Sequence, residues 1–183
     1  MSHNITLRLY REWKLFCQIK ENNHHNFPLL KHITATLVDD DASKWHIVIK
    51  NLPNSIYSQG IFHLIATFDS VHGSYKLLPK IRFITPIFHP NIHDNGHMIF
   101  NPTNTNNNED YNIATLLRSF LLFLDSPNPA NPANPTAASL YLKNYHQYKQ
   151  TVNDYIHRYA KGDIKQLYND KLYNTPQLNG EKE

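Results

Sequence analysis

The first twenty residues carry apolar side chains at the spacing of a helix. Leu9, Trp13 and Phe16 recur every three or four positions between Asn4 and Lys20, and this spacing places them on one face of an α-helix. We therefore expect the chain to open with a helix over these residues, with its apolar face buried.

Beyond the first helix, the period of apolar residues changes to that of strands. Apolar and polar residues alternate over 33–37 and over 45–49, and a third segment, 61–68, is rich in apolar and β-branched residues. Short polar turn segments separate these runs, and residues 80–84 carry a fourth strand pattern. Strands this close in sequence, joined by short turns, indicate an antiparallel meander.

The second half of the chain begins with a long irregular segment and then returns to helix. Periodicity is lost over 86–112, and a loop of this length in a compact domain usually frames a site. Residues 113–124 are apolar nearly all round, which predicts a buried helix. A proline-rich turn over 125–135 leads to a helical segment over 136–160.

The order of these elements predicts an α+β fold with one sheet. We expect one domain over 1–160, followed by a C-terminal extension over 161–183 that holds a short amphipathic helical piece and a polar tail.

Composition narrows the class of protein. The 183 residues carry 18 basic and 15 acidic side chains, a net charge of +3, which is too small a surplus to indicate nucleic-acid binding. The single cysteine, Cys17, excludes an intrachain disulfide and a paired-cysteine metal or redox site. Because no apolar run approaches the ~20 residues that span a bilayer and the start lacks a signal-peptide layout, we expect no membrane partner and a cytoplasmic or nuclear protein.

Residues 79–92, Pro-Lys-Ile-Arg-Phe-Ile-Thr-Pro-Ile-Phe-His-Pro-Asn-Ile, carry a resemblance to a known family. This segment resembles the strand and His-Pro-Asn loop of ubiquitin-conjugating (E2) enzymes. Further landmarks stand in the family's order, namely Arg8-Leu9, Glu12, Trp45, Tyr57, Gly60, Gly96 and Ser126-Pro127-Asn128-Pro129. The resemblance covers residues 5–160 and implies the UBC fold: an N-terminal helix, a four-stranded meander, a long active-site-type loop and C-terminal helices. Residues 16–23 and 83–91 are also similar to the E2 U branch.

One position departs from the family's pattern. The resemblance implies a cysteine three residues after Gly96, and that residue is Ile99. An isoleucine side chain has no nucleophilic atom, so it cannot carry a ubiquitin thioester. No cysteine follows Gly96, and Cys17 lies far upstream in the predicted first helix. We therefore expect a catalytically dead site.

Three polar residues complete the degenerate site. The resemblance implies that Asn91 would stabilise the oxyanion formed when a lysine attacks the thioester, with His89 in the same motif and Asn131 at a gate position. Without a nucleophile, we interpret His89 and Asn91 as remnants that brace the loop through backbone hydrogen bonds.

A metal site is the alternative interpretation of the histidines. His89, His93 and His97 recur every four residues and on a helix could bind zinc together. Pro90 and Gly96 disfavour a helix here, so we expect neither a metal nor a cofactor.

Two segments at which E2 enzymes contact ligases are altered. Lys76, followed by Leu77, stands near a position that is Phe in many E2 enzymes, and Glu109 and Asp110 align with the second ligase-contact loop. Because charges replace an apolar anchor, docking of ordinary RING ligases is doubtful.

These observations predict an inactive E2-like protein that serves ubiquitin conjugation as a non-catalytic variant, pairing with an active E2 and positioning ubiquitin. The alternatives are a scaffold that binds ubiquitin, a ubiquitin-like protein or an adaptor through the sheet face, and a residual conjugating activity.

Overall fold

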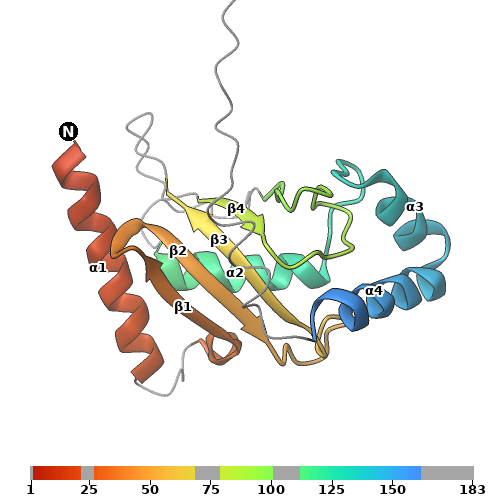
Figure 1. Ribbon diagram of the computed structural model, residues 1–183, viewed down its shortest axis with the longest axis horizontal. Helices are drawn as coiled ribbons and strands as arrows, with labels where there is room; N and C mark the ends of the chain where they lie inside the picture. The colour runs from red at the N-terminus through yellow and green to blue at the C-terminus, as the bar shows by residue number, and fades with distance from the viewer. Residues whose placement is uncertain (1, 22–26, 69–78, 101–111, 162–183) are drawn as a thin grey trace, which may run out of the picture.

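The chain opens with the expected helix. A computed structural model describes residues 2–21, 27–68, 79–100 and 112–161 (Figure 1). Helix α1 spans Ser2–Glu21, and its Leu9 and Phe16 are buried. Trp13 packs edge-on against Trp45 of the sheet, with 4.8 Å between ring centroids. The prediction of a helix with a buried apolar face is confirmed.

The sheet is an antiparallel meander in sequence order. A short 3-10 helix, η1 (Pro28–His32), leads into β1 (Ile33–Val38), β2 (Asp41–Lys50), β3 (Ile61–Thr67) and β4 (Lys80–Phe83), which are paired in the order β1-β2-β3-β4. Asp39 and Asp40, both with positive φ, make the two-residue turn between β1 and β2, a geometry that twists with the strands. The expected four-stranded meander is confirmed, with β4 ending one residue before Ile84.

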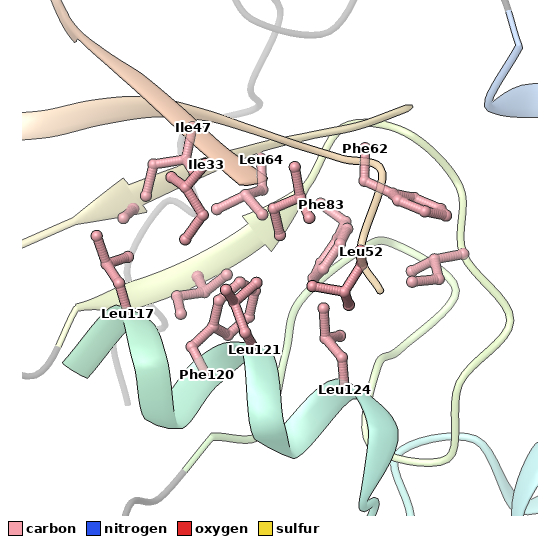
Figure 2. Packing of buried hydrophobic residues seen from close by; sticks show 14 of the residues in the cluster. Ile33, Ile47, Leu52, Phe62, Leu64, Phe83, Leu117, Phe120, Leu121 and Leu124 are labelled. Carbon is pink, nitrogen blue, oxygen red and sulfur yellow. The ribbon is translucent and has the colours of Figure 1, made fainter. Parts of the chain in front are cut away.

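Helix α2 (Ile113–Asp125) covers one face of the sheet. Figure 2 shows Leu117, Phe120, Leu121 and Leu124 of α2 directed toward side chains from the strands. The buried residues on the sheet side include Ile33, Trp45, Ile47, Ile49, Phe62, Leu64, Ala66, Ile81 and Phe83. Burying these side chains stabilises the fold by roughly 25 cal/mol for each Å² of apolar surface removed from water. Because α2 contributes many of the buried residues that face the sheet, it is the central helix of the core.

Two helices occupy the helical segment that the sequence predicts over 136–160. Helix α3 spans Pro135–Lys143 and α4 spans Tyr145–Tyr159. Asn144 separates them with φ −149° and ψ 73°, and its side-chain oxygen accepts a hydrogen bond from the backbone N–H of Gln147. Asparagine is favoured at such an N-cap because its short side chain satisfies a free N–H of the first turn. The predicted helical segment is therefore divided at Asn144 into two helices.

Helix α4 is tied to the rest of the domain through buried phenols. The hydroxyl of Tyr148 lies 2.8 Å from that of Tyr57, and Tyr57 also donates to the carbonyl oxygen of Phe88 at 2.9 Å.

The predicted helical piece after residue 160 lies outside the described residues. Among the described helices, none combines the length and the apolar character needed to cross a membrane.

Candidate functional site

The candidate site lies in the irregular segment that leaves β4 and folds back beside it. The backbone N–H of Phe83 donates to the carbonyl oxygen of Gly96 at 2.8 Å, and the N–H of Met98 donates to the carbonyl oxygen of Ile81 at 3.0 Å. Inside the segment, the N–H of His93 donates to the carbonyl oxygen of His97. The path of this loop is therefore set by main-chain hydrogen bonds.

Gly96 permits the return of the loop toward β4. Its φ is +86°, and a Cβ atom placed there would lie 2.1 Å from the carbonyl oxygen of Phe83. Only glycine fits a position that combines a left-handed backbone with this close approach. The loop therefore keeps the glycine that the sequence resemblance singled out.

Ile99 occupies the position where the resemblance implies a cysteine. Its backbone N–H donates to the carbonyl oxygen of Asn91 at 2.9 Å, and its side chain is 36% exposed. A side chain at this position therefore reaches solvent next to Asn91. Isoleucine offers only C–H groups there, so the position cannot form an acyl bond.

His89 is enclosed and neutral. It is fully buried, and its Nδ1 accepts a hydrogen bond from the backbone N–H of Asn91 at 3.0 Å. Burial lowers the pKa of His89 to about 4, against smaller opposing contributions from the backbone of Leu124 and Phe123. Its Nε2 is without a hydrogen-bond partner of good geometry among the described residues. An uncharged, enclosed imidazole supports the loop and is not placed to exchange protons with solvent.

Asn91 uses its whole side-chain amide to hold another segment. Its Nδ2 donates to the carbonyl oxygens of Asn128 and Asn131 at 2.7 and 3.0 Å, and its Oδ1 accepts from the N–H of Asn128 at 2.8 Å. Both amide protons are therefore engaged in this state, and neither is free to stabilise an oxyanion. This geometry supports the interpretation of Asn91 as a structural residue.

The proline-rich turn after α2 is fastened to the loop at further points. The carbonyl oxygen of Pro90 accepts hydrogen bonds from the N–H groups of Ala133 and Asn134 at 2.8 and 2.9 Å, and Nδ2 of Asn134 donates to Oδ1 of Asp94 at 3.3 Å. Asn131 contributes its backbone carbonyl, while the residue as a whole is exposed. The structure thus brings His89, Asn91, Ile99 and Asn131 into one region.

Asn134 is a residue that the sequence analysis did not single out. Besides its contacts with the loop, its side-chain oxygen accepts from the N–H of Ala137 and so caps α3. The signal was available, because asparagine followed directly by proline is typical of a helix start.

Cys17 lies elsewhere, on α1. It is half-buried, and α1 packs against β2 and α2. Burial and the neighbouring Glu21 carboxylate raise the pKa of the Cys17 thiol, which reduces the fraction of nucleophilic thiolate. Cys17 is therefore neither in the loop nor activated.

The remaining candidates divide between exposed positions and undescribed segments. His93 and His97 are exposed while His89 is buried, and within the described ranges no group of three or more His, Cys, Asp or Glu residues is placed to hold a metal ion. Lys76, Leu77, Glu109 and Asp110 lie outside the described residues.

Comparison with known proteins assigns the family. The family model for ubiquitin-conjugating enzymes matches residues 8–156, and this chain belongs to that family. A mimivirus protein named "Probable ubiquitin-conjugating enzyme E2 L460", from Acanthamoeba polyphaga mimivirus, is 32% identical over 78% of this chain and 89% of its own length. Ubiquitin-conjugating enzyme E2 2 of Kluyveromyces lactis is 26% identical over 91% of this chain and 95% of its own length.

A solved structure agrees with the assignment. The "putative ubiquitin conjugating enzyme from Plasmodium yoelii" superposes with a TM-score of 0.68 and 27% identity, covering 86% of this chain and 96% of that one. The family fold implied by the sequence resemblance is therefore confirmed.

Proposed function

We propose that this chain is a non-catalytic member of the ubiquitin-conjugating enzyme family that assists ubiquitin conjugation without forming a thioester. The observation that carries the proposal is Ile99, which stands where the family resemblance implies the cysteine nucleophile. Its backbone is hydrogen-bonded to Asn91 and its side chain is partly exposed.

Two further observations support an inactive site. Cys17, the single thiol of the chain, is on α1, and burial raises its pKa. The amide of Asn91 is engaged by two backbone carbonyls. Both observations are consistent with a loop that is held in place without a nucleophile at its centre.

A protein of this kind can act by positioning. In the proposed role it pairs with an active conjugating enzyme and holds ubiquitin so that one of its lysines meets the thioester of the partner. Holding two reactants in the right geometry accelerates a reaction without any bond being formed to the protein that holds them.

A charging assay tests the loss of catalysis. The purified chain is incubated with ubiquitin, activating enzyme and ATP and analysed on a non-reducing gel. We expect no thiol-sensitive adduct on the wild-type chain. The variant Ile99→Cys is expected to form one, because the backbone of residue 99 is held by main-chain contacts that the substitution leaves in place.

The controls separate the two candidate thiols. Ile99→Ala should behave as the wild type, and Cys17→Ser should abolish any adduct that forms on α1. A thiol-sensitive adduct on the wild-type chain would contradict the proposal. To test the pairing, the chain is mixed with each of a panel of active conjugating enzymes and run on a size-exclusion column with light-scattering detection. The proposed role predicts a species with the mass of a heterodimer.

The outer face of the sheet favours a second candidate function, that of a binding scaffold for ubiquitin, a ubiquitin-like protein or an adaptor. Helix α2 lies on the opposite face (Figure 1), and none of the described helices packs on the outer one. The outward positions include polar residues, among them Thr34, His46, His63 and Lys80, and the apolar Val48 and Ile65. A pull-down distinguishes the two functions, because a stable complex with an active conjugating enzyme is expected from the first function and not from this one.

A further inference from the structure

Two histidines lie side by side on the outer face of the sheet. His46 of β2 and His63 of β3 each stand between buried residues of the core. Because successive side chains of a strand point to opposite faces, both imidazoles point away from α2. The register pairs His46 with Ile65 and His63 with Val48, which makes the two histidines diagonal neighbours across the strand pair.

The facing ring nitrogens of this pair are close enough to share one metal ion. Nε2 of His46 lies 3.1 Å from Nδ1 of His63, and the rings are nearly parallel, with 17° between their planes and 5.2 Å between their centroids. Zinc binds imidazole nitrogen at ~2.0–2.1 Å, so two such nitrogens on one ion lie about 2.9 Å apart at right angles and about 3.3 Å apart at the tetrahedral angle. The observed separation falls between these two values.

In this structure the two nitrogens make a hydrogen bond, in which one donates and the other accepts. Coordination requires both facing nitrogens to be free of protons, so the donor imidazole must carry its proton on its other ring nitrogen. Both rings stay neutral in this exchange of tautomers, and a rotation of each ring directs the two lone pairs to a common point. Burial lowers the pKa of His46, which favours the neutral form that binds metal.

The surroundings of the pair favour a metal that imidazole itself binds well. Val48 and Ile65, the residues opposite the two histidines, are apolar, and Lys44 and Arg82 are on the same face. Calcium and magnesium bind to oxygen ligands, chiefly carboxylates, which these four residues do not offer. Imidazole suits transition metals such as zinc and copper. The two cationic neighbours lower the affinity for any cation, but solvent screens their effect at a half-exposed surface.

We propose that His46 and His63 form a two-histidine binding site for a divalent transition-metal ion such as zinc, which links β2 to β3 on the outer face of the sheet. The ion replaces the hydrogen bond between the rings, and water fills its remaining coordination positions. Two protein ligands suit an exchangeable ion, in contrast to the four ligands of a structural zinc site. The alternative is that the pair serves only as a hydrogen bond between the strands.

A cobalt titration followed by amide NMR tests the site on the full-length, tag-free chain. The chain has 12 histidines, so the readout must be resolved residue by residue. The probe is Co²⁺, a paramagnetic ion that binds the same kinds of ligand as zinc. We expect the amide signals of residues 46 and 63 and of their cross-strand neighbours to broaden or shift first. Excess Zn²⁺ should reverse the effect, and Mg²⁺ should not.

Matched variants assign the ligands. His46→Gln and His63→Gln should each weaken Co²⁺ binding at this site by about tenfold or more, since the loss of even an outer-shell partner of a metal ligand costs about 10–100-fold. His93→Gln and His97→Gln remove exposed histidines of the loop and should leave the affinity measured at the β2 and β3 amides within about twofold. Circular dichroism verifies folding. If a variant unfolds, the set of amides that broadens in the wild-type chain still decides the proposal.

Three results would overturn the proposal. One is an absence of any effect on the β2 and β3 amides at about 1 mM Co²⁺, which would leave the pair as a hydrogen bond between strands. Another is broadening confined to other segments of the chain. The third is equal binding by the wild type, His46→Gln and His63→Gln. None of these results would alter the outcome of the charging assay, because Ile99 is not part of the pair.

Discussion

At the scale of single residues, main-chain and side-chain hydrogen bonds fix the path of the loop at the candidate site. The side chain of Ile99 takes no part in these hydrogen bonds. Gly96, Asn91 and His89 each make contacts that set the path of the loop. Ile99 contributes only its backbone N–H to the same network. Substitutions at the first three residues should therefore affect stability, whereas a substitution at Ile99 should affect chemistry.

Replacing Gly96 by alanine should destabilise the fold strongly. The added Cβ would meet the carbonyl oxygen of Phe83, and the φ of +86° is unfavourable for any L-residue with a side chain. We expect Gly96→Ala to lower the free energy of unfolding by about 2–4 kcal/mol, measured by urea denaturation. Asn54 lies in an exposed turn and has a φ of 57°. The variant Asn54→Ala therefore measures the cost of a positive φ alone, and it should lower the free energy of unfolding by about 1 kcal/mol. Equal losses in both variants would contradict the close approach.

The buried imidazole of His89 should make stability depend on pH. Its folded pKa of about 4 lies below the unfolded value near 6.5, so the unfolded chain takes up the proton first as the pH falls. The free energy of unfolding should therefore be highest above about pH 6.5 and should fall by up to about 3 kcal/mol on acidification to pH 4.

The comparison of two asparagine variants tests this assignment. His89→Asn should remove that part of the pH dependence of unfolding, whereas His93→Asn, at an exposed position, should keep it. An unchanged slope in His89→Asn would show that other groups cause the acid sensitivity.

The residues of the candidate site could be named from sequence, but their partners could not. His89, Asn91, Gly96 and Ile99 follow from a motif that is local in the chain. The contacts of Asn91 reach residues 128 and 131, and only the packing of the loop on the turn after α2 determines which groups meet. Sequence reasoning therefore gave a structural role for Asn91 without the bonds that explain it.

At the scale of elements, helix α2 is anchored at its start by two side chains from different parts of the chain. Oδ1 of Asn112 accepts from the N–H groups of Ala114 and Thr115, and Oε2 of Glu12 on α1 accepts from the N–H of Ile113 at 2.9 Å. The first N–H groups of a helix have no partner within the helix. Glu12 thus links α1 to the central helix.

Removing the Glu12 carboxylate should weaken this link. Glu12→Ala is expected to lower the free energy of unfolding by about 1–2 kcal/mol, because a charged acceptor is lost from a helix N-terminus. Glu12→Gln, which keeps an acceptor oxygen, should lose about half as much. Thermal or urea unfolding gives both values, and Glu21→Ala on an exposed residue of α1 should change stability by less than about 0.5 kcal/mol. A loss in Glu21→Ala equal to that in Glu12→Ala would exclude the specific contact.

Sequence periodicity predicted the elements better than it predicted their ends. The helix over 113–124 and the strand pairings follow from buried apolar positions, which the chain displays directly. The break at Asn144 was missed because the tyrosines on both sides keep helical spacing, with Tyr141 and Tyr148 in ring contact across it. The boundary there is set by the capping side chain of Asn144, and the spacing of apolar residues carries no information about caps.

At the scale of the whole molecule, the C-terminal helices are joined to the sheet side by few but buried contacts. Tyr57 and Tyr148 bring their hydroxyls together, and Phe88 packs against both Tyr148 and Tyr155. The N–H of Ile61 at the start of β3 also donates to the carbonyl oxygen of Ala160. These contacts hold α4 against the start of β3 and the segment that follows β4.

Removing the hydroxyl of Tyr57 should weaken the attachment of α4 more than removing that of Tyr148. Tyr57→Phe leaves both the Phe88 carbonyl and the Tyr148 hydroxyl without this partner and should lower the free energy of unfolding by about 1–3 kcal/mol. Tyr148→Phe should lose less, because Tyr57 keeps its bond to Phe88. Hydrogen exchange of α4 amides checks whether protection falls in both variants. Tyr145→Phe, at an exposed tyrosine, is the control, and equal effects in all three would contradict the buried pair.

The hydrogen bonds around position 99 have a consequence for how such a protein can change over time. Among the described residues, the hydrogen bonds that shape this stretch belong to the main chain or to other side chains, so none of them depends on which side chain stands at position 99. Reactivity at this point can be lost or regained while the architecture persists, and only selection for catalysis itself would detect the difference.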